Sequence, residues 1–311
     1  EQVLKWGSEA KLKVVPTGIA HGTVTVVSDG VPLEVTTFRR DVETDGRRAV
    51  VAFTKEIEED ARRRDFTMNA LYARPDGTVV DPLGGAADLI AGRVRFIEDA
   101  SERIREDYLR ILRFFRFSAW YANPDLGFDA DALAAIATHV DGLGTLSKER
   151  VGAEMLKLLA AADPAPAIAT MRQQNVLAAV LPGTDDRALA PLIHLEGEAN
   201  VAPDPLRRIA ALGGESLELN LRLSKEQSRK VSDLREVATG TMHPAEMGYR
   251  YGAELASDAL LLRYALLETV FDANDLRQAE KGAGAVFPIS AADLMPDVTG
   301  PALGERLREL E

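Results

Sequence analysis

The chain has 311 residues, with 37 Lys and Arg against 49 Asp and Glu, and a formal net charge of -12 at pH 7. Its 46% hydrophobic and 28% charged residues suit a globular protein with a real core and exclude disordered and collagen-like classes. The absence of cysteine excludes a disulfide framework, thiol catalysis and any zinc site built on cysteine. Because no apolar run reaches about 18 residues and the N-terminus lacks the features of a signal peptide, we expect a cytoplasmic protein with no membrane partner.

The first third of the sequence predicts a mixed α/β arrangement. Three short β-branched segments separated by turn signals predict strands, at residues 12–15, 22–27 and 32–38. The polar stretch 39–49 predicts a loop, whereas the acidic-then-basic order of 53–64 predicts a helix. Residues 72–80 predict a further strand, turn and strand.

From about Ser101 onward the apolar periodicity is helical. Apolar residues from Ile104 to Phe115 fall on one stripe, which predicts a single continuous helix capped by Ser101. Further helical patterns follow to the end of the sequence. We therefore expect an α/β head and an all-helical remainder.

The charge is distributed unevenly along the chain. Residues 1–120 hold 19 basic and 20 acidic residues, so nearly all of the negative charge belongs to the helical part. Between residues 61 and 117 there are eleven arginines and no lysine. Arginine without lysine favours planar, bidentate recognition of phosphates, carboxylates or bases, although an ion-paired surface is the alternative interpretation.

Three clusters of residues stand out: a dense set of hydrogen-bonding side chains at 63–69, a flexible hinge with a helix cap at 81–89, and the polar side of a predicted helix at 106–113. In the third cluster, Asp107 and Arg110 are neighbours on one face of the predicted helix. An ordinary surface ion pair, including Glu106 with Arg110, is one interpretation. The other is base recognition, because a carboxylate only accepts hydrogen bonds and a guanidinium only donates them. Side by side, they complement cytosine and adenine but not uracil or guanine.

The clusters, in this order, resemble the class II tRNA nucleotidyltransferases, the CCA-adding enzymes, and their relatives the bacterial poly(A) polymerases. Four motifs carry the resemblance: Arg-Arg-Asp-Phe-Thr-x-Asn at 63–69, Asp-Pro-x-Gly-Gly-x-x-Asp-Leu at 81–89, Glu-Asp-x-x-Arg-x-x-Arg at 106–113 and Ser-Lys-Glu-Arg at 147–150. It implies a polymerase β-like α/β nucleotidyltransferase head over 1–95, followed by an all-α neck with the nucleotide-selecting helix (96–162), body (163–240) and tail (241–311).

The resemblance also implies roles for individual residues. Asp107 and Arg110 would read the incoming base. The nucleotide and its triphosphate would be contacted by Arg64, Arg113 and Arg116, although Arg116 is half a turn away from Asp107 on an ideal helix. The sugar and phosphate side of the pocket would be shaped by Arg63, Asp65 and Asn69. Glu34 would be the accessory catalytic carboxylate near the metals.

The implied activity is addition of CCA to tRNA 3′ ends from CTP and ATP, with release of pyrophosphate and the help of two Mg²⁺ ions. The Asp-x-Asp pair that would bind both ions does not occur in this sequence near the expected position. We expect it upstream of Glu1, and we expect the chain without it to be inactive. The same observation leaves open a non-catalytic RNA-binding protein.

Two segments bear on the choice among relatives. Residues 14–27 lack the basic, aromatic-rich signature of bacterial poly(A) polymerases. Residues 40–50, with Asp45-Gly46-Arg47, resemble the flexible loop that enzymes adding only CC lack. Both features favour full CCA addition, with poly(A) addition as the alternative.

Overall fold

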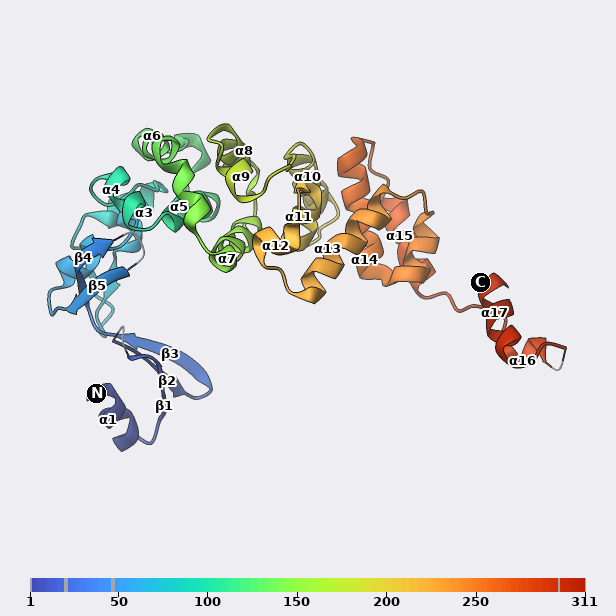
Figure 1. Cartoon of the computed structure of the whole chain (residues 1–311), viewed down its shortest axis with the longest axis horizontal. Helices are drawn as coiled ribbons and strands as arrows, with labels where there is room; N and C mark the ends of the chain where they lie inside the picture. The colour runs from blue at the N-terminus through green and yellow to red at the C-terminus, as the bar shows by residue number, and fades with distance from the viewer. Residues whose placement is uncertain (1, 20–21, 46–47, 296, 311) are drawn as a thin grey trace. The chain divides into compact units, whose positions relative to one another are not determined.

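The computed structural model describes residues 2–19, 22–45, 48–295 and 297–310. The chain divides into two compact units. One comprises Glu1–Thr184 and Gly214–Leu223, and the other comprises Asp185–Gly213 and Ser224–Glu311. The α/β head and the all-helical remainder predicted from the sequence are confirmed (Figure 1). The boundaries of head, neck, body and tail at 95, 162 and 240 stay a prediction.

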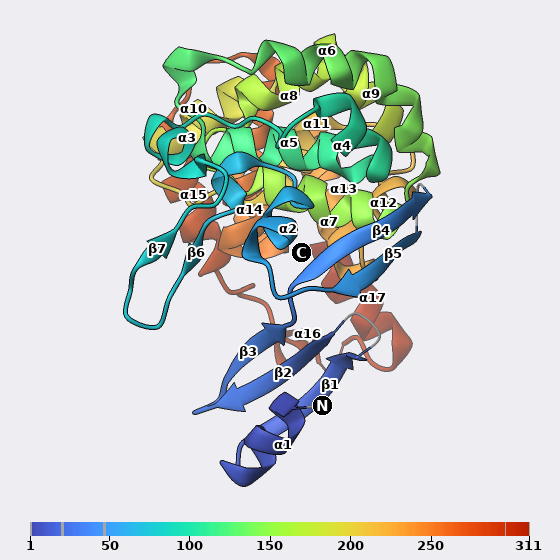
Figure 2. The same ribbon diagram turned by 90° about the vertical axis from the view of Figure 1, so that its left-hand side faces the viewer.

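The first unit begins with helix α1 (Gln2–Glu9) and an antiparallel sheet of β1 (Lys13–Gly18), β2 (Thr23–Ser28) and β3 (Val31–Thr36). Figure 2 shows the three strands side by side in that order. Asp29 and Gly30 both have positive φ, of 50° and 80°, which is the backbone that a tight hairpin between β2 and β3 requires. The three strands predicted from β-branched segments are confirmed.

The loop predicted at residues 39–49 was wrong. Strand β4 (Arg39–Asp45) pairs antiparallel with β5 (Arg48–Phe53), from Arg39 opposite Phe53 to Asp45 opposite Arg48. Strand pairing uses main-chain groups, so a polar sequence can form it, and side-chain polarity misled the prediction. Gly46 and Arg47, in the centre of the predicted flexible loop, lie outside the described residues.

The head continues with short elements packed on a buried core. They are α2 (Ile57–Arg62), the 3-10 turn η2 (Thr67–Asn69), the β6 (Tyr72–Ala73) and β7 (Val79–Val80) hairpin and α3 (Gly85–Ala91). Phe66 is fully buried between two aromatic rings, with centroids 5.0 Å from Phe96 and 4.9 Å from Phe117. This core fixes the segment 63–69 against the helices that follow.

The continuous helix predicted from Ser101 was also wrong. Two helices, α4 (Ala100–Glu106) and α5 (Leu109–Tyr121), are separated at Asp107, whose φ of -156° and ψ of 104° are extended. The Asp107 carboxylate accepts the backbone N–H of Leu109 at 3.1 Å, a local bond that competes with helical hydrogen bonding. The N-cap of α4 is Asp99 rather than Ser101, since its side chain accepts from the N–H of Glu102 at 2.8 Å.

The rest of the first unit is helical. Its elements are η3 (Pro124–Leu126), α6 (Ala130–His139), η4 (Val140–Thr145), α7 (Lys148–Leu159), α8 (Ala165–Gln173), α9 (Val176–Val180) and α12 (Leu217–Leu221). Helix α5 packs against α7 and α8. A Cβ on Gly152 would lie 1.8 Å from the carbonyl oxygen of Leu221, so only glycine allows α7 to approach α12 this closely.

The second unit contains α10 (Leu189–Glu198), α11 (Pro205–Leu212), α13 (Lys225–Thr239), α14 (Pro244–Leu267), α15 (Ala273–Ala283), α16 (Ala291–Leu294) and α17 (Pro301–Leu310). Arg207 and Arg208 are buried in this unit and share the carboxylate of Glu196, while Arg207 also pairs with Asp258. In the described part of the chain, no helix is both long and apolar enough to cross a membrane.

Candidate nucleotide-binding site

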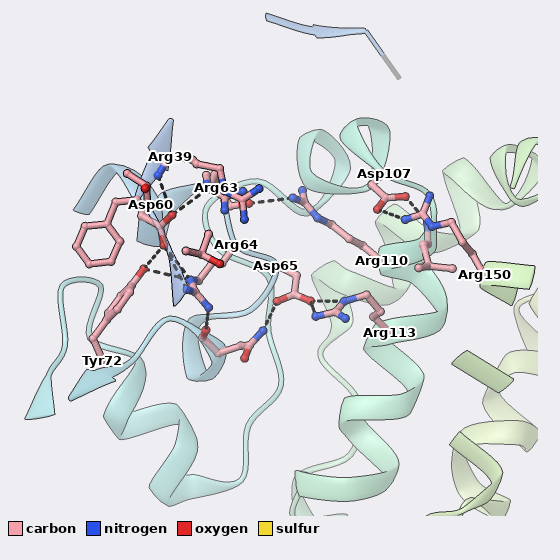
Figure 3. A pocket seen from close by; sticks show the side chains of 15 residues that line it. Arg39, Asp60, Arg63, Arg64, Asp65, Tyr72, Asp107, Arg110, Arg113 and Arg150 are labelled. Atoms are coloured by element: carbon pink, nitrogen blue, oxygen red, sulfur yellow. Dashed lines mark hydrogen bonds and ion pairs between the residues drawn. The ribbon is translucent and has the colours of Figure 1, made fainter. Parts of the chain in front are cut away.

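A pocket of about 500 Å³ opens in the first unit, where the β3–β4 junction, the segment after α2 and the α4–α5 break come together. Figure 3 shows the side chains converging on it. The residues that line it are Thr36, Thr37, Phe38, Arg39, Asp60, Arg63, Arg64, Asp65, Asn69, Tyr72, Asp107, Leu109, Arg110, Arg113 and Arg150.

Most of the residues assigned from the sequence meet in this pocket. They are Arg63, Arg64, Asp65, Asn69, Asp107, Arg110 and Arg113. Two do not line it. Glu34 is exposed on β3 opposite Thr25, and the Nε of Arg116 donates instead to Glu154 at 2.6 Å.

Asp107 and Arg110 do not share a helical face, because Asp107 lies in the break before α5. They still line the same pocket, each anchored by other groups. The Oδ2 of Asp107 accepts from Arg150 at 2.6 Å. Arg110 donates to the Glu106 carboxylate at 2.5 Å and, as Figure 3 shows, reaches across to the segment after α2, where Arg63 accepts through its backbone carbonyl at 2.9 Å.

The ion pair between Glu106 and Arg110, considered from the sequence as an ordinary surface contact, therefore forms, but with both side chains largely buried. It fixes the guanidinium at the pocket wall and leaves the Nε of Arg110 with no partner among the described residues. The carboxylate of Asp107 is held at two points and keeps acceptor capacity, since an ionised carboxylate has several lone pairs. The ion pair of Arg110 with Glu106 is therefore compatible with a role of Arg110 and Asp107 in reading a base.

Asp65 connects the head to helix α5 through hydrogen bonds. It is buried, and its Oδ2 accepts from the Nε of Arg113 at 2.6 Å. Its Oδ1 accepts from Asn69 at 2.8 Å and from the backbone N–H of Phe66 at 3.0 Å. Because each carboxylate oxygen has a donor, Asp65 positions both Arg113 and Asn69 toward the pocket.

A second buried carboxylate, Asp60, was missed by the sequence prediction. Its oxygens accept from Arg39, Arg63, Arg64 and Tyr72. Burial opposes ionisation of Asp60, but the backbone N–H of Arg39, the Tyr72 hydroxyl and the Arg63 guanidinium outweigh it and lower the pKa of this carboxyl. Burial and the bond to Asp60 raise the pKa of Tyr72 to about 12, so its hydroxyl remains a donor.

The charge of the pocket differs from that of the chain. Six arginines and three aspartates line it, a surplus of three positive charges in a chain whose net charge is -12. Guanidinium groups bind phosphate oxygens through paired N–H donors. The pocket therefore suits an anion of several charges, despite the acidity of the whole sequence.

The described residues do not by themselves fit a metal centre. Within the described ranges, no three or more His, Asp or Glu side chains are grouped so that they could hold an ion. The pocket carboxylates Asp60 and Asp65 are instead occupied by arginines, an amide and main-chain N–H groups.

Two protein-family models match segments of the chain. A model of the poly A polymerase head domain matches residues 2–95. A second model, described as the probable RNA and SrmB-binding site of polymerase A, matches residues 125–187. The two matches flank the segment that carries Asp107, Arg110 and Arg113.

Solved structures share the fold. The Bacillus stearothermophilus CCA-adding enzyme in complex with CTP superposes with a TM-score of 0.74 at 24% identity, over 96% of this chain and 78% of that one. The Thermotoga maritima CCA-adding enzyme complexed with tRNA gives a TM-score of 0.66 at 18% identity, over 96% and 76%. The fold is that of CCA-adding enzymes.

Curated relatives show the family to which the chain belongs. The mitochondrial CCA tRNA nucleotidyltransferase 1 of Danio rerio is 33% identical over 310 residues, 94% of this chain and 71% of the relative. That of Mus musculus is 37% identical over 68% of the chain, and the CCA-adding enzyme of Levilactobacillus brevis is 42% identical over 49%. The chain spans 50% of the mouse protein and 38% of the bacterial one. It belongs to the tRNA nucleotidyltransferase family of CCA-adding enzymes.

Proposed function

We propose that the full-length protein adds CCA to the 3′ end of tRNA, using CTP and ATP and releasing pyrophosphate. The observation that carries this proposal is the pocket itself, which joins the Asp107 carboxylate and the Arg110 guanidinium to a cluster of other arginines. One part of such a pocket can hold a base, and the other can hold a triphosphate.

Base selection follows from the hydrogen-bonding capacity of the two groups. Cytosine and adenine each present an amine beside a ring nitrogen that accepts a hydrogen bond. The amine can donate to the free lone pairs of Asp107, and the ring nitrogen can accept from Arg110. Uracil and guanine present a carbonyl in place of the amine, which would set two acceptors against each other at Asp107.

The phosphate side of the pocket contains Arg63, Arg64 and Arg113. We propose that these guanidinium groups bind the triphosphate and orient the α-phosphate toward the tRNA 3′-hydroxyl. The hydroxyl oxygen forms a new bond to the α-phosphorus, its proton is released, and the bond to the bridging oxygen of the β-phosphate breaks, so pyrophosphate leaves. Arg113 is fixed for this task by the buried Asp65, at 2.6 Å.

Two Mg²⁺ ions belong to the proposal and would activate the hydroxyl and neutralise charge on the leaving group when bound. Among the residues of this chain, Glu34 would be the accessory carboxylate beside them. Arg116 does not line the pocket and its guanidinium pairs with Glu154, so its contact with the nucleotide stays a prediction. The cytoplasmic location expected from the sequence stays a prediction.

The test is extension of a tRNA that lacks its terminal CCA by the full-length protein with Mg²⁺, CTP and ATP. The proposal predicts a product longer by C, C and A. A long tail of adenylate from ATP alone would instead identify a poly(A) polymerase. Tight tRNA binding without extension would identify a non-catalytic RNA-binding protein, and either result would contradict the proposal.

A further inference from the structure

We propose that Asp60 is a positioning residue, which holds Arg63 and Arg64 so that their guanidinium groups face the triphosphate. The inference rests on the proposed function for the identity of the ligand, a nucleoside triphosphate. It assigns the strength of phosphate binding to a residue that does not itself touch the nucleotide.

The geometry gives Asp60 donors on both carboxylate oxygens. Its Oδ1 accepts from the backbone N–H of Arg39 and from the Nε of Arg63, both at 3.1 Å. Its Oδ2 accepts from the Tyr72 hydroxyl at 2.9 Å and from a terminal nitrogen of Arg64 at 3.2 Å. The side chain is only 4% exposed, so this carboxylate is surrounded by its partners rather than by water.

The way Asp60 binds Arg63 leaves the binding surface of that arginine open. Only the Nε of Arg63 donates to Asp60, and its two terminal nitrogens have no partner among the described residues. A guanidinium recognises phosphate best through two parallel N–H groups. Asp60 therefore fixes the inner edge of Arg63 while the outer edge faces the pocket (Figure 3).

Arg64 is fixed in a complementary way. Its Nε donates to the Tyr72 hydroxyl at 3.1 Å, and its guanidinium carbon lies 5.0 Å from the centre of the Tyr72 ring. Two adjacent arginines repel each other, and the negative charge of Asp60 between them offsets that repulsion. Without it, both side chains would have more conformational freedom and would lose entropy when they bind the triphosphate.

Asp88 provides a matched control, because it is the same residue type in the same unit. It is 2% exposed and accepts from the Thr67 hydroxyl and from Arg95, both at 2.6 Å. None of these residues lines the pocket. Asp60→Asn and Asp88→Asn therefore remove the same charge from two equally buried sites, and only one of them supports pocket arginines.

The experiment compares D60N and D88N in the full-length enzyme. For D60N we expect the KM for CTP and for ATP to rise together by about tenfold or more, the size of a lost hydrogen bond to a charged group. Inhibition by inorganic tripolyphosphate, which has no base, should weaken by the same factor, while the preference for CTP over UTP is unchanged. D88N should leave all three quantities close to wild type.

A double-mutant cycle separates positioning from general loss of structure. If Asp60 acts through Arg63, the effect of D60N on tripolyphosphate inhibition should be much smaller in an Arg63→Ala background. Full additivity of the two effects would overturn the inference, as would a D60N enzyme with the nucleotide KM of D88N.

A second variant covers the case in which D60N does not fold. Arg63→Lys keeps a positive charge but cannot bind Asp60 and present two parallel donors at once, so it should weaken tripolyphosphate inhibition. Arg62→Lys, at the neighbouring surface arginine paired with Glu98, should not. Equal values for the two variants would overturn the inference. Failure of the wild-type enzyme to extend tRNA would instead overturn the proposed function, so the two failures are distinguishable.

Discussion

Replacing Asp107 with Asn tests the proposed selection of the base most directly. The shape of the side chain is kept, but one acceptor oxygen becomes an NH₂ donor and the charge is lost. The Oδ1 of Asp107 accepts from the N–H of Leu109 at 3.1 Å and the Oδ2 accepts from Arg150 at 2.6 Å. The amide oxygen can keep only one of these partners, and the new NH₂ group would face the amine of cytosine.

The magnitude follows from the hydrogen bond that is exchanged. A bond to a charged group contributes about 1.5–3 kcal/mol, which corresponds to about a 10- to 100-fold loss of preference for CTP over UTP. The ion pair with Arg150 is partly exposed, with 47% and 33% of the two side chains accessible. Its loss should cost at most about 1 kcal/mol of stability, so D107N is expected to fold.

The assay measures kcat/KM for CTP and for UTP on the same tRNA, together with the affinity for tRNA. Asp129→Asn is the control, because Asp129 caps α6 through the N–H of Ala132 at 2.9 Å and asparagine caps a helix equally well. D129N should keep the wild-type preference. A D107N enzyme with unchanged preference and weaker tRNA binding would refute the base-reading role.

Further predictions concern stability. Arg207→Ala should lower the free energy of unfolding of the second unit by about 3–5 kcal/mol in urea titrations, because it removes a buried partner of Glu196; a loss within the error of the measurement would contradict the buried ion pair. Gly152→Val should lower the melting temperature, since even its Cβ would lie 1.8 Å from the Leu221 carbonyl oxygen. The lowered pKa of Asp60 means that its ionised form stabilises the fold above the ordinary value of 3.8 and that this contribution is lost as pH falls through the lowered pKa. In acid titrations D60N should therefore lose less stability below pH 3.8 than wild type, and an identical acid transition would contradict this.

Hydrophobic patterning predicted the three strands of the first sheet and the helical remainder, because the spacing of apolar residues along the sequence differs between a strand and a helix. It could not locate the break at Asp107, since the apolar stripe from Ile104 to Phe115 continues through both α4 and α5. The break depends on one local hydrogen bond, from the N–H of Leu109 to the Asp107 side chain.

The sequence predicted only some of the residues of the candidate site, because it does not show which side chains pair in the folded chain. Motif residues such as Arg64 and Arg113 stand out by type and spacing and line the pocket. Asp60 does not stand out, because an acid in the first turn of a helix is ordinary on the surface, and only the folded chain shows that it is buried among two arginines and a tyrosine. Arg116 is the reverse example: the sequence assigned it to the nucleotide, but in the folded chain its guanidinium donates to Glu154.

In the proposed function, residues of the protein, not a nucleic-acid template, choose the added nucleotides. The most direct measurement presents the full-length enzyme with a tRNA that ends in CC and with all four nucleoside triphosphates, and sequences the 3′ end of the product. We predict that one A is added, after which addition stops. Incorporation of U or G at that position, or a continuing run of A, would contradict it.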